Sequence, residues 1–146
     1  MTAYVQESGK MTVYVQERFP LARVLIADDS LPLRCGLRKL IEEHTGWVCA
    51  EALNGGDAIT KIQQCPPDIL ILDLCMPGMD GLQAAQALSK LAPDLPILLC
   101  TTDLPPSLVS MAQHCGIQGT VSKYDYRQII NGIEALLRHE TFFCRN

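Results

Sequence analysis

The chain has 146 residues, a length that fits one domain of ordinary size. Hydrophobic residues make up 48% and charged residues 19% of it, which is a globular composition and argues against a disordered chain. The net charge is −4, and the absence of a basic excess argues against direct binding of nucleic acid.

No apolar run approaches the roughly 18 residues that would span a membrane, and the N-terminus lacks the basic-then-apolar pattern of a secretory signal. The seven cysteines are an odd number, widely spaced and without a Cys-x-x-Cys pair, and the histidines are equally scattered. Neither a disulfide framework nor a zinc site has this pattern. We therefore expect a cytoplasmic protein that does not contact a membrane.

Residues 1–20 differ from the rest of the chain. The segment Thr2-Ala3-Tyr4-Val5-Gln6-Glu7 is nearly repeated as Thr12-Val13-Tyr14-Val15-Gln16-Glu17. Two copies of six residues are too few for a repeat architecture. We expect an N-terminal extension outside the core, with disorder as one option, in preference to an added pair of strands.

From Arg23 onward, apolar runs typical of strands alternate with apolar residues at helical spacing. The predicted elements are strand 24–27, helix 33–41, strand 47–50, helix 58–62, strand 69–72, helix 82–91, strand 97–100, helix 108–112, strand 119–122 and helix 129–137. The run at 69–72 is unbroken, as in a parallel strand buried on both faces. We predict an α/β fold in which five helices flank a doubly wound parallel sheet of five strands.

Polar residues follow four of these strands directly. They are Asp28, Asp29, Asp73, Thr101 and Lys123. Because ligands of open α/β sheets bind outside the carboxyl ends of the strands, we expect these side chains to meet at one edge of the sheet.

Three carboxylates in one place repel each other unless a cation offsets their charge. Carboxylate oxygens suit Mg²⁺, which commonly binds one or two protein carboxylates together with a phosphate. Asp73 could then act as a nucleophile toward phosphorus and form an aspartyl phosphate. Mg²⁺, the Lys123 ammonium and the Thr101 hydroxyl would each bind one oxygen of the transferred group.

At this point the sequence resembles the receiver domain of response regulators in two-component signalling. The residues that carry the resemblance are Ala27-Asp28-Asp29-Ser30, Leu72-Asp73-Leu74-Cys75-Met76-Pro77-Gly78-Met79-Asp80-Gly81, Thr101 and Ser122-Lys123. The resemblance covers about residues 22–140 and implies a CheY-like (flavodoxin-like) fold. It divides the chain into the extension 1–20, a receiver domain 21–140 and a C-terminal tail 141–146.

The resemblance also implies a site and partners. Asp73 would accept phosphate from a sensor histidine kinase, and Asp29, Asp73 and the backbone carbonyl of Cys75 would bind Mg²⁺ with help from Asp28. Such a protein is not an enzyme in the usual sense, since at most it catalyses its own phosphorylation and dephosphorylation. The signal would leave through the fourth helix, fifth strand and fifth helix, a surface that could also form a homodimer.

Some positions depart from the pattern of the family. Thr120 stands where an aromatic switch residue is usual, three residues before the lysine. Thr102 replaces a common small apolar residue. Cys75 and Asp103 stand two residues after Asp73 and Thr101, at positions that tend to tune the lifetime of the phosphate. These departures keep open an alternative, an atypical receiver that binds partners but switches weakly or not at all.

Two other classes fit less well. A phosphatase of the haloacid dehalogenase type needs a second aspartate where Cys75 stands. A flavodoxin-like FMN protein needs a phosphate-binding loop where Asp28 and Asp29 would repel phosphate. The ending of the chain resembles receivers that precede a helix-turn-helix of the LuxR/NarL type, which indicates transcription regulation. Both a stand-alone receiver and the receiver part of a longer regulator remain open.

Overall fold

The computed structural model describes residues 2–7, 10–15 and 22–145, and it describes side chains from residue 22 onward. Near the N-terminus, β1 (Thr2–Glu7) and β2 (Lys10–Val15) pair with each other in an antiparallel sheet of two strands. From the sequence we expect an extension outside the core in preference to an added pair of strands; the two strands do pair, but in a sheet of their own that is separate from the larger sheet. The remaining residues of that extension lie outside the described residues.

The larger sheet alternates with helices along the chain. Its elements are β3 (Arg23–Ala27), α1 (Leu31–Thr45), β4 (Val48–Ala52), α2 (Gly55–Gln64), β5 (Ile69–Asp73), α3 (Gly81–Leu91), β6 (Ile97–Thr101), α4 (Pro106–His114), β7 (Gly119–Ser122), α5 (Tyr126–Leu137) and β8 (Phe142–Phe143). The strand order is β4-β3-β5-β6-β7-β8, and every neighbouring pair is parallel. The predicted α/β fold with five helices is therefore confirmed.

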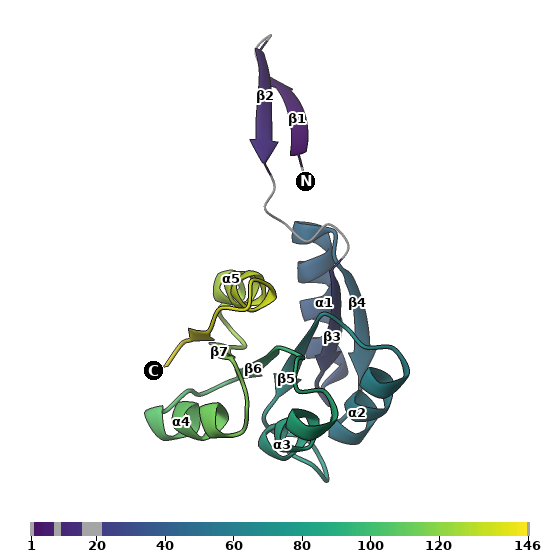
Figure 1. Ribbon diagram of the computed structural model, residues 1–146, viewed down its shortest axis with the longest axis vertical. Coiled ribbons are helices and arrows are strands. Elements are labelled where there is room, and N and C mark those ends of the chain that lie inside the picture. The colour runs from purple at the N-terminus through teal and green to yellow at the C-terminus, as the bar shows by residue number, and fades with distance from the viewer. Residues whose placement is uncertain (1, 8–9, 16–21, 146) are drawn as a thin grey trace.

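Helices cover both faces of this sheet. Helices α1 and α5 lie on one side, and α2, α3 and α4 lie on the other (Figure 1). The two apolar layers follow from the alternation of side chains along each strand: Leu70 and Leu72 belong to the layer under α2 and α3, whereas Ile69 and Ile71 belong to the layer under α1 and α5. All five residues of β5 are buried, as its unbroken apolar run predicts.

The sequence also marks where the helices begin. The Ser30 side chain accepts a hydrogen bond from the backbone N–H of Leu33 and caps α1. Asp80 and Gln83 form a capping box at the start of α3, in which each side chain accepts a hydrogen bond from the backbone N–H of the other residue. Among the described residues, no helix is both long and apolar enough to cross a membrane.

The sheet has one strand more than the sequence predicts. Residues 142–143, expected to belong to a C-terminal tail, form β8 beside β7. Gly119 permits this approach, because a Cβ there would lie 2.8 Å from the carbonyl oxygen of Phe142. The reason for the addition is physical: β7 would otherwise leave a row of unpaired backbone groups at the edge of the sheet.

Candidate functional site

The polar residues that follow the strands meet at one edge of the sheet. Asp73 ends β5, Thr101 ends β6, and Asp28 and Lys123 come directly after β3 and β7. One carboxylate oxygen from each of Asp28, Asp29 and Asp73 lies within 4.8 Å of the others. The parallel topology produces this cluster, since it brings the carboxyl ends of all these strands to the same side.

Lys123 joins two of the acids. Its Nζ lies 2.9 Å from Asp73 Oδ1 and 3.0 Å from Asp28 Oδ2. Asp73 is only 4% and Asp28 only 7% exposed, while Asp29 is exposed. The cluster is thus a buried pair of carboxylates bridged by one ammonium group, with a third carboxylate at the solvent side.

Burial governs the proton affinities of the bridged groups. The pKa of Asp73 is raised above its usual value, first because the carboxylate is desolvated and also because Asp28 repels it, although a hydrogen bond from Lys123 acts in the opposite direction. The pKa of Lys123 is also raised, because its hydrogen bonds to Asp73 and Asp28 outweigh its own desolvation. Three carboxylates and one ammonium leave this edge with an excess of negative charge, so a further cation would be stabilised there.

The loop after β5 packs tightly against the end of that strand. The backbone N–H of Gly81 donates to the carbonyl of Leu74 at 2.8 Å. A Cβ at Gly81 would overlap the carbonyl oxygen of Asp73. The backbone N–H of Cys75 lowers the pKa of Asp73 by hydrogen bonding, and the side chain of Cys75 is exposed.

Thr101 and Lys123 are linked through the backbone of neighbouring strands. The N–H of Lys123 donates to the carbonyl of Thr101 at 2.9 Å, and Thr101 pairs in register with Ser122. Thr101 is 4% exposed, whereas Thr102 and Asp103 are exposed in the loop that follows. The structure thus brings Thr101 to the edge that carries the acids.

Thr120 lies away from this edge. Its side chain is fully buried, and its hydroxyl donates to the carbonyl of Cys144 at 2.7 Å, while the N–H of Cys144 donates back to the carbonyl of Thr120 at 2.9 Å. The position that the resemblance assigns to an aromatic switch residue is therefore a polar attachment point for the segment that contains β8.

Thr120→Val is expected to loosen that segment. Valine keeps the shape of threonine but removes the hydrogen bond, at a cost of about 1 kcal/mol. Hydrogen exchange measured by NMR should show faster exchange at the amides of Phe142 and Cys144. Thr102→Val, the same substitution at an exposed threonine, should leave these rates unchanged, and equal rates in both variants would contradict the attachment.

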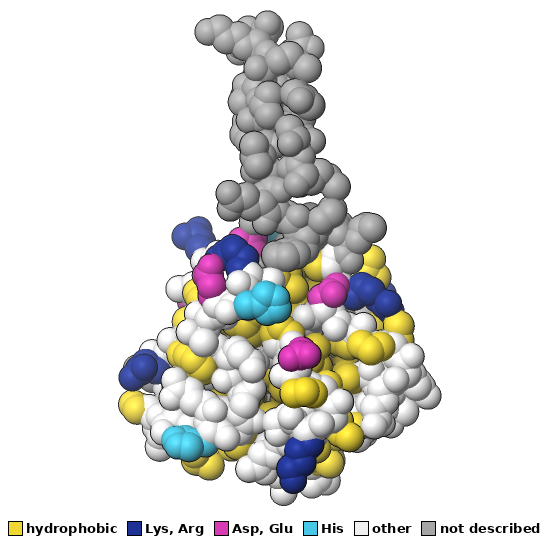
Figure 2. Space-filling view, viewed as in Figure 1, with side chains coloured by type: hydrophobic (Ala, Val, Ile, Leu, Met, Phe, Trp, Pro, Cys, Tyr) yellow, Lys and Arg dark blue, Asp and Glu magenta, His cyan; other side chains and the backbone are white. Residues whose placement is uncertain are grey.

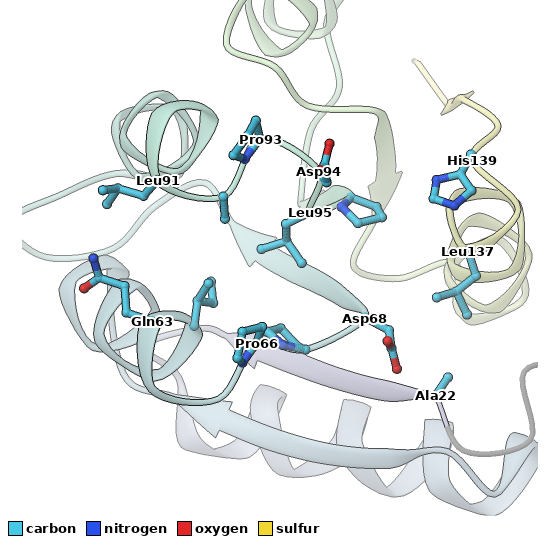
Figure 3. Close-up of a pocket in the computed structure, with 14 residues that line it drawn as sticks. Ala22, Gln63, Pro66, Asp68, Leu91, Pro93, Asp94, Leu95, Leu137 and His139 are labelled. Carbon is cyan, nitrogen blue, oxygen red and sulfur yellow. The ribbon is translucent and has the colours of Figure 1, made fainter.

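A groove of about 970 Å³ lies elsewhere and contains none of the candidate residues. It is lined by residues that precede β5 and β6 and by the end of α5, including Asp68, Leu95 and His139 (Figure 3). These residues lie at the amino ends of the strands, opposite the acidic cluster. On the face drawn in Figure 2, the Lys and Arg side chains are scattered and form no basic patch.

Comparison with known proteins agrees with this geometry. Residues 24–134 match the response regulator receiver domain family. The chain is 33% identical to the chemotaxis protein CheY of Thermotoga maritima over 101 residues, which cover 69% of this chain and 84% of that protein. It is 34% identical to the virulence-factor transcription regulator BvgA of Bordetella pertussis over 125 residues, which cover 83% of this chain and 58% of BvgA.

Solved structures give the same result. A LuxR-family two-component response regulator from Aurantimonas sp. SI85-9A1 superposes with a TM-score of 0.80 at 30% identity, covering 84% of this chain and 89% of that one. The isolated receiver domain of RcsB from Salmonella enterica, solved with the phosphomimetic BeF₃⁻, gives a TM-score of 0.75 at 25% identity and covers 85% and 94%.

The fold, the site and these comparisons define a signalling protein of two-component systems. The chain belongs to the response regulator receiver domain family. Its relatives include both CheY proteins and transcription regulators, and it spans 58% of the length of BvgA. Receiver domains bind Mg²⁺ at an acidic pocket, and the oxygen donors of Asp28, Asp29 and Asp73 fit that ion.

Sequence reasoning missed one residue close to this site, Arg34. Its side chain is buried in α1 and donates a hydrogen bond to the carbonyl of Asp28. A signal was present in the sequence, because Arg34 precedes Leu37 and Ile41 by three and seven residues and so lies on the apolar face of its helix.

Proposed function

We propose that this chain is a phosphorylation-dependent switch that accepts a phosphoryl group on Asp73 from a sensor histidine kinase. The observation that carries the proposal is the Lys123 bridge between Asp28 and Asp73, with Asp29 close by at the same edge. Asp28 and Asp73 are buried and share one ammonium, and Asp29 lies beside them at the solvent side, so the cluster combines a nucleophile, a cation and oxygen ligands for a metal ion, as phosphoryl transfer requires.

Each residue has a chemical role in this transfer. An Asp73 carboxylate oxygen attacks phosphorus, the bond from phosphorus to the kinase imidazole breaks, and the imidazole keeps the electron pair. Lys123 turns from the carboxylate to the incoming phosphoryl oxygens, and the Thr101 hydroxyl donates to another of them. Asp29, Asp73 and the carbonyl of Cys75, assisted by Asp28, would hold Mg²⁺. When bound, the ion would offset the charge of the carboxylates and of the phosphoryl group.

The signal would reach a partner through the surface that contains β7. The backbone N–H of Lys123 donates a hydrogen bond to the carbonyl of Thr101, so a shift of Thr101 toward the phosphate would also move the end of β7. The surface formed by α4, β7 and α5, now including β8, would change and would contact a second copy or an output partner. The LuxR-family neighbours favour an output in transcription regulation.

The decisive test is phosphorylation by a small donor. With acetyl phosphate and Mg²⁺, the intact mass of the protein is expected to rise by one phosphoryl group, and the rise should disappear with excess EDTA. Asp73→Asn should stay unlabelled. Asp94→Asn, at an exposed acid of the groove, should label as the wild type does. An unlabelled wild type, or a labelled Asp73→Asn, would contradict the proposal.

One observation favours the second candidate, a receiver that binds partners without switching. Thr120 has no aromatic ring that could turn inward, and its hydroxyl is held by the carbonyl of Cys144. NMR spectra with and without beryllofluoride distinguish the two functions. A switch should show shifts in α4 and along α5 as well as at the acidic edge, whereas a non-switching receiver would show shifts only at the acidic edge.

A further inference from the structure

Arg34 is a charged residue in a place where a charge is costly. Its side chain is only 6% exposed, because it lies on the face of α1 that packs against the sheet. Burial of a guanidinium destabilises a protein unless its donors are paired. The partners of Arg34 therefore indicate what the residue does.

These partners connect the acidic edge to a neighbouring strand. The NH1 group of Arg34 donates to the backbone carbonyl of Asp28 at 2.7 Å, and its Nε donates to Glu51 Oε1 at 3.0 Å. Glu51 lies in β4, beside Ile26 of β3. Its other carboxylate oxygen accepts from Arg38 NH1 at 3.1 Å. Burial raises the pKa of Glu51, but hydrogen bonds from Arg38 and Arg34 outweigh it and lower the pKa overall, so Glu51 is ionised and neutralises Arg34.

The hydrogen bond from Arg34 completes the fixation of Asp28. The Asp28 N–H donates to Ala52, Oδ1 accepts from the Ser30 N–H at 2.9 Å, Oδ2 binds Lys123, and the carbonyl accepts from Arg34. The next residue, Asp29, is exposed and has no side-chain hydrogen bond within residues 22–145. Since the peptide unit is planar, the Asp28 carbonyl sets the direction of the Asp29 backbone.

We propose that Arg34, held by Glu51, is a positioning residue for the Mg²⁺ ligand Asp29; this inference rests on the proposed function. Arg34 fixes the peptide between the two aspartates, so the Asp29 carboxylate starts from one backbone direction although no hydrogen bond from the described side chains holds it. Groups that orient metal ligands in this way change metal affinity by about 10- to 100-fold when they are removed.

Electrostatics alone predicts the opposite sign. Removing the positive charge of Arg34 leaves the negative charge of Glu51 less fully neutralised. The surroundings of the acidic edge become more negative, which would strengthen binding of a divalent cation. The positioning role predicts weaker binding. The sign of the change in Mg²⁺ affinity therefore separates the two explanations.

The experiment compares Arg34→Met with Arg38→Met in the full chain. Mg²⁺ affinity is measured by an NMR titration with MgCl₂, followed on the backbone amide of Asp29. Arg34→Met is expected to bind Mg²⁺ about 10-fold or more weakly. Arg38 also pairs with Glu51 but does not reach Asp28, so Arg38→Met should bind Mg²⁺ as well as the wild type or slightly better.

A third variant separates positioning from loss of fold. Arg34→Met/Glu51→Gln removes both charges, so its melting temperature should recover toward that of the wild type while its Mg²⁺ affinity stays low. If Arg34→Met binds Mg²⁺ as well as the wild type, or if affinity recovers together with melting temperature in the double variant, the positioning role is wrong. A wild type that is not phosphorylated and does not bind Mg²⁺ would instead overturn the proposed function itself.

Discussion

Replacing Gly81 with alanine is expected to destabilise the protein by about 3 kcal/mol, because the new methyl group has no space. A Cβ at this position would overlap the carbonyl oxygen of Asp73 and lie 3.0 Å from the Cα of Leu74. Both contacts are with backbone, so no side chain can rotate away. The end of β5 must move instead, and Asp73 moves with it. Urea denaturation should show the loss of stability, and labelling of Asp73 by acetyl phosphate should slow.

A second glycine provides the control for Gly81→Ala. Gly36 lies in the exposed part of α1, and a Cβ there would meet no atom within 4 Å. Gly36→Ala is therefore expected to stabilise the helix by about 0.5–1 kcal/mol and to leave labelling unchanged. If Gly81→Ala and Gly36→Ala had similar free energies of unfolding, close packing at Gly81 would not explain a loss of stability.

Much of the fold follows from local sequence, because the central strands β3, β5 and β6 consist mainly of short apolar runs. Burial on both faces needs such runs, and the charged residues that end them cannot continue into the core. The same logic predicts the edge at which Asp28, Asp73 and Lys123 meet, since parallel topology decides where all the carboxyl ends lie. The bridging contacts of Lys123 agree with that prediction.

The features that sequence reasoning missed depend on contacts between distant segments. Glu51 meets Arg34 only because β4 pairs with β3 in one register, and a shift of one residue would turn Glu51 to the other face. β8 is two residues long, too short to show a period, and it forms because the edge of β7 is available. Neither feature can be found by a pattern within one segment.

The structure also explains why two acids of the site are unequal. Asp28 is held by hydrogen bonds to its own loop and by Lys123, whereas Asp29 is exposed. A carboxylate without fixed partners can bind a hydrated ion with little loss of existing bonds. In the proposed switch, Asp29 would then be a direct ligand of the metal ion and Asp28 would keep Lys123 in place.

Replacing Lys123 with methionine is expected to prevent efficient phosphorylation and to destabilise the protein without Mg²⁺. Methionine keeps most of the apolar stem but leaves Asp28 and Asp73 buried and facing each other without a cation. Removing one partner from a buried ion pair costs about 3–5 kcal/mol. Urea denaturation in EDTA at pH 7 measures this loss, and Lys90→Met, at an exposed lysine of α3, controls for the change in net charge with an effect within about 0.5 kcal/mol.

The pH dependence of Lys123→Met shows whether charge is the cause. In the wild type the pKa of Lys123 is raised above 10.5, so the contribution of this lysine to stability is complete below pH 10.5 and is lost only as the pH rises through the raised value.

In the variant, the pKa of Asp73, already raised by burial, rises further. The lost stability should therefore be largest at neutral pH and shrink toward pH 4 as Asp73 is protonated. Mg²⁺ should stabilise the variant more than the wild type, because it replaces the missing cation. A loss that is equal at pH 7 and pH 4 and insensitive to Mg²⁺ would instead assign the effect to packing of the lysine stem.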